Sequence, residues 1–98
     1  MTESTIPKRL KAAREESGLS QKVLGIRVGF DEFVASARMN QYERGVHTPN
    51  FSTVERIAAV LKVDAAYFYC RDESLARIIK TYSQSNRQKK KKILLSAE

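Results

Sequence analysis

The stretch Leu19-Ser-Gln-Lys-Val-Leu-Gly-Ile-Arg-Val-Gly29, followed fourteen positions later by Glu43-Arg-Gly45, decides the fold of this chain. Ser20 can accept a backbone hydrogen bond at the start of a helix over residues 21–28. Gly29 can take the left-handed backbone conformation that ends such a helix. A second helix then runs into Glu43 and stops at Gly45. The stretch therefore predicts two short helices joined by a turn that contains glycine.

The composition favours one folded, helical domain with a basic surface. A chain of 98 residues is long enough for one hydrophobic core. Its 42% hydrophobic residues, with two prolines and four glycines, suit a folded and largely helical protein. The net charge of +7 favours an anionic partner. Two short helices joined in this way, in a basic chain, are typical of a helix-turn-helix that reads DNA.

The residue types present exclude several classes of protein. No apolar run is long enough to cross a membrane, and the opening Met-Thr-Glu-Ser-Thr does not begin a secretory signal. Cys70 cannot form an internal disulfide, and one thiol with one histidine cannot build a structural zinc site. No nucleophile–base pair, carboxylate dyad or phosphate loop is visible. We therefore expect a cytoplasmic protein without enzymatic activity, metal or cofactor.

Capping residues and apolar spacings predict an all-α fold, since no alternating β-pattern competes with them. The helix over 21–28 is expected to bury Val23, Leu24 and Val28. Gly25 within it predicts the close approach of a neighbouring backbone. The other helices are expected over about 6–17, from 31 to 44, from 48 through 61, from 64 for one to two turns, from 72 through 82, and from 85 to 95.

Two of these helices carry apolar residues at the spacing of a core-facing side. In the helix that follows Pro49 these are Val54, Ile57, Ala58 and Leu61. In the helix that Asp72 is expected to cap they are Leu75, Ile78, Ile79 and Tyr82. Capping boxes are predicted at Ser52 with Glu55 and at Ser85 with Gln88.

Over about residues 6–69 the chain resembles the Cro and phage-repressor (Xre-type) helix-turn-helix family. The matching positions are Arg9-Leu10-Lys11, Arg14, Gly18-Leu19-Ser20-Gln21, Leu24, Gly29, Tyr42-Glu43-Arg44-Gly45, Pro49, Ile57-Ala58 and Leu61-Lys62-Val63. The resemblance implies a five-helix, lambda-repressor-like DNA-binding domain over residues 1–70, whose third helix enters the major groove. Residues 71–98 would then form a C-terminal helical extension.

The resemblance also implies roles for individual residues. Arg14 and Glu43 match positions that form a structural ion pair, and Met39 falls at a buried position. The expected base-reading residues are Ser36, Ala37, Arg38 and Gln41. The residues expected near the DNA backbone are Gln21, Lys22, Asn40, Arg44, His47, Thr48 and Asn50.

The distance from Gly29 to Glu43 is four residues longer than in the family pattern, and the extra residues fall within Phe30–Val34. Either the third helix gains a turn at its start, or the linking turn becomes a longer loop. We expect the extra helical turn, because the acidic pair Asp31-Glu32 suits the first turn of a helix. Since phosphates would repel these acids, the new turn is expected to point away from DNA.

The C-terminal segment leaves several interpretations open. The run Lys89–Lys92 is a solvated helix face, a non-specific nucleic-acid clamp or an interaction tail. The apolar residues 93–95 that follow need burial, and packing on Ile78, Ile79 and Tyr82, within the chain or across a dimer, would supply it.

Together these features predict a sequence-specific transcriptional regulator, expected to be a repressor, that binds double-stranded DNA as a homodimer on paired half-sites. One alternative is an antitoxin that represses its own operon while residues 72–98 hold a toxin as protein partner. The other is a protein-interaction module that keeps the fold without reading DNA.

Overall fold

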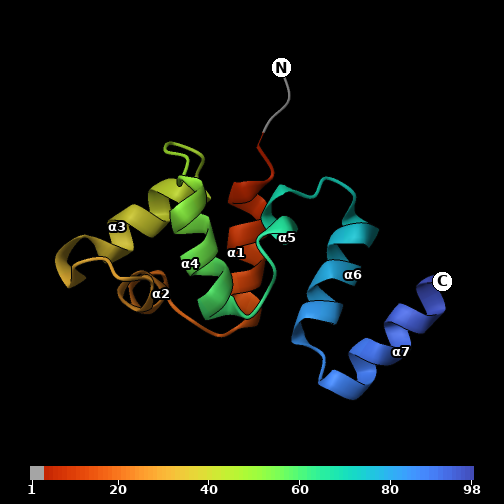
Figure 1. The fold of residues 1–98 in the computed structure, drawn as a ribbon. Helices are drawn as coiled ribbons and strands as arrows, with labels where there is room; N and C mark the ends of the chain where they lie inside the picture. The colour runs from red at the N-terminus through yellow and green to blue at the C-terminus, as the bar shows by residue number, and fades with distance from the viewer. Residues whose placement is uncertain (1–3) are drawn as a thin grey trace.

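The computed structural model describes residues 4–98, and within this range the chain is all-α, as predicted (Figure 1). Residues 1–3 lie outside the described range, and they are part of the opening segment that is not expected to begin a secretory signal. No helix of the described residues is long and apolar enough to cross a membrane. The helices are α1 (Ile6–Glu16), α2 (Gln21–Val28), α3 (Glu32–Glu43), α4 (Phe51–Leu61), α5 (Ala66–Tyr69), α6 (Glu73–Gln84) and α7 (Arg87–Ala97).

Helices α1 to α5 enclose one hydrophobic core, to which each contributes a side chain with at most 2% of its surface exposed. These side chains are Leu10, Leu24, Met39, Ile57 and Phe68. Met39 is therefore buried as predicted, and α4 buries the whole predicted set of Val54, Ile57, Ala58 and Leu61.

Short polar side chains begin most of these helices, as the sequence indicated, because they satisfy backbone N–H groups that the first turn leaves free. Ser20 accepts from the amide of Val23, and Asp72 accepts from that of Leu75. The two predicted capping boxes are wrong. Asn50 caps α4 and Asn86 caps α7, which places Ser52 inside the first turn of α4.

The packing of α2 against α3 explains the glycine within α2. A Cβ added at Gly25 would lie 2.7 Å from the Cβ of Ala35 and 2.8 Å from its carbonyl oxygen. The predicted close approach is confirmed. The predicted burial of Val23 is wrong, because α2 turns its Leu24–Gly25 side toward α3 and leaves Val23 38% exposed.

Helix α6 joins the core through a different face from the one predicted. It buries Ala76, while Leu75 and Ile78 stay half-exposed and Ile79 packs only at the edge of the core. The register follows from Arg9 of α1, a buried side chain that donates to the carbonyl of Cys70 and to the carboxylate of Glu73. These bonds fix the start of α6, so its apolar face turns away from α1.

Candidate nucleic-acid interface

Helix α3 presents one side to the core and the opposite side to solvent. Its buried side chains are Ala35, Met39 and Tyr42. Among the expected base-reading residues, Ser36, Ala37 and Arg38 are exposed and Gln41 is half-buried. The helix begins at Glu32, and Asp31 accepts from the amide of Phe33 at 2.9 Å. Residues 32–34 of the enlarged segment are therefore helical and Asp31 caps them, so α3 gains a turn at its start, as expected, and the whole helix is continuous.

Arg38 and Gln41 face the same hollow. With Tyr42, His47 and Thr48 they line a depression of about 350 Å³ between α3 and the loop that follows it. Three residues along a helix bring two side chains onto neighbouring positions of one face. The hollow is thus lined by two of the four expected base-reading residues, Arg38 and Gln41, and by two residues expected near the DNA backbone, His47 and Thr48.

An aromatic pair supports Arg38. Its guanidinium carbon lies 5.2 Å from the centroid of the Phe30 ring, within range of a cation–π interaction. The Phe30 ring in turn lies 6.2 Å from that of Tyr42, which is buried. The aromatic pair therefore holds the guanidinium of Arg38 itself, while the residue as a whole remains exposed.

The predicted ion pair between Arg14 and Glu43 is present. The guanidinium donates from Nε to one carboxylate oxygen at 2.5 Å and from Nη2 to the other at 3.0 Å. The pKa of Arg14 is raised, chiefly by its hydrogen bond to Glu43. Arg14 also donates to the carbonyl of Leu19, which fixes the segment that leads into α2.

Gln21 has a more internal role than expected. Its side-chain amide donates to Glu43 at 3.1 Å and to Asn40 at 3.3 Å, so the side chain belongs to the same network as the ion pair. The backbone amides of Gln21 and Lys22 have no hydrogen-bond partner among the described residues. The first turn of α2 therefore offers backbone donors to an anion.

A second hollow, of about 430 Å³, lies where α1, α2 and α3 meet. Glu43 neutralises Arg14 there, whereas Lys11 and Arg44 are exposed at its rim and take part in no salt bridge of residues 4–98. Lys11 was not singled out as a contact from the sequence. Its spacing of three residues from Arg14 on the same helix was the available signal.

The remaining expected backbone contacts are more dispersed. Lys22, Thr48 and Asn50 are exposed, and the side-chain oxygen of Asn50 is occupied by the amide of Thr53. Lys22 and Asn50 line neither hollow. Within residues 4–98 no three His, Cys, Asp or Glu side chains are grouped as metal ligands would be.

Comparison with protein families identifies the architecture. A family model described as a helix-turn-helix domain matches residues 8–67, well over half of the chain. The chain belongs to the helix-turn-helix family. It is similar over nearly its whole length to a solved structure, described as the crystal structure of transcriptional regulator BswR, at 50% identity and a TM-score of 0.86. That match covers 94% of this chain and 91% of the other.

The matches to the family model and to the solved structure establish the class of the protein. It is a transcriptional regulator with a helix-turn-helix DNA-binding domain and C-terminal helices, from a family that does not catalyse reactions. No sequence among the curated proteins matches the chain significantly. Within the helix-turn-helix, α2 and α3 are the paired helices, and the extra turn at the start of α3 lengthens the second.

Proposed function

We propose that this helix-turn-helix protein is a sequence-specific repressor that inserts α3 into the major groove of double-stranded DNA. The observation that carries the proposal is the shared hollow of Arg38 and Gln41 on the exposed side of α3. Arginine pairs with two acceptors of guanine and glutamine with the two edge groups of adenine, each worth about 1–3 kcal/mol of discrimination. Ser36 and Ala37 lie on the same helix and complete the base-reading set.

The proposed phosphate contacts flank α3 on both sides. On one side are the free amides at the start of α2 and the cations Lys11 and Arg44, around the hollow that Gln21 and Asn40 also line. On the other side lie His47 and Thr48, with Asn50 beyond them and Lys22 on the exposed surface of α2. Such contacts supply affinity and register without sequence information, and each weakens binding with salt by a slope of about −0.9.

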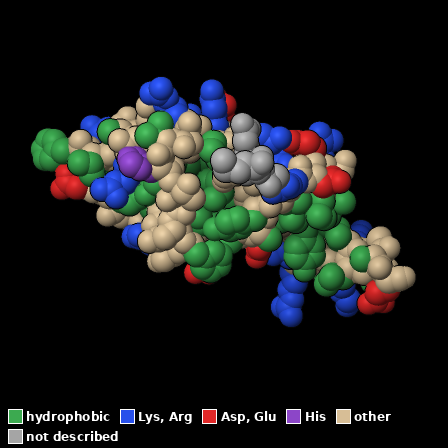
Figure 2. All heavy atoms as spheres, turned by 90° about the horizontal axis from the view of Figure 1, so that it is seen from above, with side chains coloured by type: hydrophobic (Ala, Val, Ile, Leu, Met, Phe, Trp, Pro, Cys, Tyr) green, Lys and Arg blue, Asp and Glu red, His purple; other side chains and the backbone are tan. Residues whose placement is uncertain are grey.

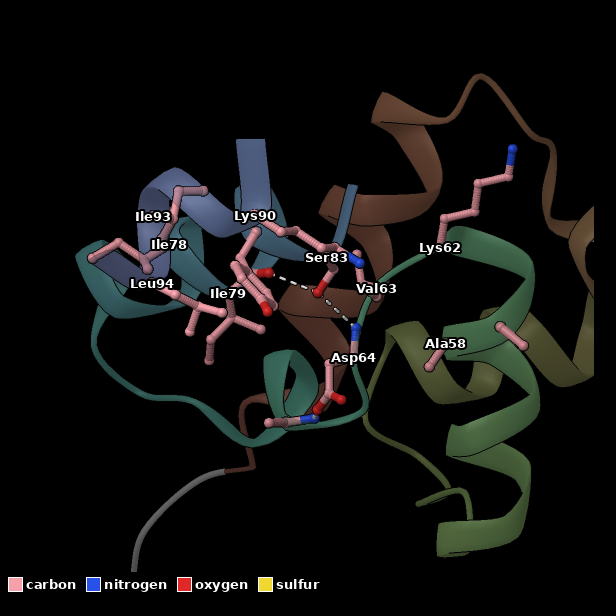
Figure 3. A pocket seen from close by; sticks show the side chains of 13 residues that line it. Ala58, Lys62, Val63, Asp64, Ile78, Ile79, Ser83, Lys90, Ile93 and Leu94 are labelled. Atoms are coloured by element: carbon pink, nitrogen blue, oxygen red, sulfur yellow. Dashed lines mark hydrogen bonds between the residues drawn. The ribbon is translucent and has the colours of Figure 1, made fainter. Parts of the chain in front are cut away.

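We further propose that the protein binds DNA as a homodimer formed through α6 and α7. Leu75, Ile78, Leu94 and Leu95 are each at least half exposed. Ile78, Ile79, Ile93 and Leu94 line a groove of about 620 Å³, with Ala58 of α4 on its far side (Figure 3). Hydrophobic side chains also gather on the upper face of the molecule and continue toward the end that holds α6 and α7 (Figure 2).

A second copy of this chain fits that surface for two reasons. Both α6 and α7 contribute to it, so two copies related by a two-fold axis could exchange the same helix faces. A dimer would also present two α3 helices to half-sites about one helical turn apart. The antitoxin alternative uses the same surface, residues 72–98, for a different protein. The interaction-module alternative lacks a role for the exposed Arg38 beside Gln41.

Selection of bound sequences from a random duplex pool tests the proposal. Enrichment of a two-fold symmetric motif would support sequence reading by a dimer, acting in the cytoplasm on its operator. No enrichment at moderate salt would contradict it and favour the interaction module. Enrichment of a single, asymmetric half-site would contradict the dimer alone, and a second small protein that copurifies would favour the antitoxin.

A further inference from the structure

Helix α6 is attached to the rest of the protein largely through polar groups. Among its residues 73–84 only Ala76 is buried, and Ile79 packs at the edge of the core. A polar cavity of about 280 Å³ lies between α1 and α6, with Arg9 and Glu73 among the side chains that line it. Because little apolar surface joins α6 to α1, the direction of α6 depends on hydrogen bonds and ion pairs.

Arg9 makes most of these bonds at the start of α6. Its side chain is only 5% exposed. Nε and Nη2 donate to the carbonyl oxygen of Cys70 at 3.0 and 2.8 Å, and Nη2 also donates to that of Arg71 at 3.3 Å. Nη1 donates to the carboxylate of Glu73, the first residue of α6, at 2.9 Å. Since a planar guanidinium presents its donors in a fixed fork, these bonds set an orientation as well as a distance.

Polar groups also hold the far end of α6. Lys80 pairs with Glu16 of α1, and the hydroxyl of Ser83 accepts from the backbone amide of Asp64 at 3.0 Å. The ion pair is partly exposed, and exposed ion pairs contribute little to stability. The buried fork of Arg9 is therefore the main constraint on the direction of α6.

Helix α1 connects this constraint to the proposed DNA interface. An α-helix turns by about 100° per residue, so Glu16 lies about 20° from Arg9 around the axis of α1. By the same geometry Lys11 and Arg14 lie on the opposite side, about 160° and 140° from that position. One side of α1 thus holds α6, while the other carries the Arg14–Glu43 pair that fixes the end of α3 (Figure 1).

We propose that Arg9 is a positioning residue that sets the distance and rotation between the two DNA half-sites. The inference rests on the proposed function, because it requires a dimer formed through α6 and α7. In that dimer the two α3 helices are connected through α1, the Arg9 fork and α6 of each subunit. One base pair shifts a half-site by about 3.4 Å and rotates it by about 35°. A change in the angle between α1 and α6 therefore alters which spacing both α3 helices can reach together.

Binding of the full-length protein to duplexes of different spacing tests the proposal. Each duplex carries two copies of the selected half-site, with the spacing varied in single base pairs, and one further duplex carries a single half-site. Wild type should bind one spacing best, at least about 100-fold more tightly than the single half-site, because the second contact forms within the complex only where the geometry allows it.

Arg9→Lys keeps the charge but loses the fork that joins two carbonyls and a carboxylate. It should bind the single half-site as wild type does, since Arg9 lies away from the proposed DNA contacts. The gain at the best spacing should fall by about tenfold, and neighbouring spacings should differ less from one another. Sedimentation should show that the variant remains a dimer.

Glu73→Lys is a second variant that leaves the core intact, because the side chain of Glu73 is 67% exposed. It places a cation beside Lys8 and Arg9 and should flatten the spacing profile in the same way. Glu55→Lys makes the same change of charge at an exposed site of α4 and should keep the wild-type profile.

The proposal is overturned if either variant, folded by circular dichroism, keeps the wild-type profile, or if wild type binds all spacings equally. It is also overturned if the variants become monomers, because loss of the dimer would then explain the change. These results would leave base reading and the wild-type dimer intact. A wild-type protein that binds only as a monomer would instead contradict the proposed dimer.

Discussion

Glu43 receives two hydrogen bonds from the guanidinium of Arg14, which joins the end of α3 to α1. The carboxylate has only 4% of its surface exposed, and Gln21 at the start of α2 donates to it as well. Three helices are therefore fixed to one another by a single acidic group. Because Lys11 and Arg44 lie around the same hollow, the pair also sets the position of the proposed phosphate contacts.

Loss of one partner of this pair should destabilise the protein strongly. Glu43→Gln leaves the Arg14 guanidinium without its charge partner in a mostly buried site, and we expect the free energy of unfolding to fall by about 3–5 kcal/mol. Urea denaturation measures the change. Glu55→Gln, the same substitution at an exposed site of α4, should change stability by less than about 0.5 kcal/mol. Equal effects of the two substitutions would contradict a structural role for the pair.

Gly25→Ala should destabilise the fold even though alanine favours helices. In an exposed helix the exchange would stabilise by about 1 kcal/mol. Here the new methyl group would meet the Cβ and backbone of Ala35 at less than 3.0 Å, so α2 and α3 must separate. We expect a net loss of about 1–3 kcal/mol by thermal or urea unfolding. A gain in stability would show that the two helices are not packed as described.

Glu73 gives the protein an acid-dependent stability. Hydrogen bonds from Lys8 and then Arg9 lower its pKa to about 2, from an ordinary value of 4.5. A depressed carboxyl pKa stabilises the folded state above about 4.5, and this contribution is lost as the pH falls toward about 2. The urea midpoint of Glu73→Gln should therefore lie below that of wild type at pH 7 and approach it at pH 2. A difference that stays constant over this range would contradict the assignment.

Ile78→Lys should separate the proposed dimer. The substitution places a charge in the apolar groove between α6 and α7, and an unpaired charge is costly to bury. We expect the dissociation constant of the dimer to rise at least about tenfold by analytical ultracentrifugation. Thr81→Lys, which adds the same charge at an exposed position of α6 outside the groove, should leave the oligomeric state unchanged. A wild-type protein that is monomeric at micromolar concentration would contradict the dimer.

Most of the fold could be predicted because its determinants are local. Helix α2 begins at the side-chain cap of Ser20 and ends at the left-handed backbone of Gly29. The buried residues of α4 repeat at the spacing of one helix face. The exposed face of α6 could not be predicted, since it depends on Arg9, which binds Cys70 and Glu73 more than sixty residues away. The internal bonds of Gln21 were missed for the same reason: they depend on the approach of α2 to Asn40 and Glu43.

The proposed DNA interface also contains residues that the sequence predicted and residues that depend on how the helices pack. Counting back from Glu43 predicted Arg38 and Gln41, which line one hollow. The contribution of Lys11 could not be predicted, because it depends on how α1 meets α3.

The most direct test of the account compares Arg38→Ala with Lys11→Ala on the selected operator and on duplexes with single base-pair changes. Arg38→Ala should lose about 5- to 150-fold on the operator and little on a duplex that already lacks its guanine. Lys11→Ala should weaken all sequences by a similar factor and reduce the salt slope by about 1. Equal losses for Arg38→Ala on operator and random DNA would contradict base reading by α3.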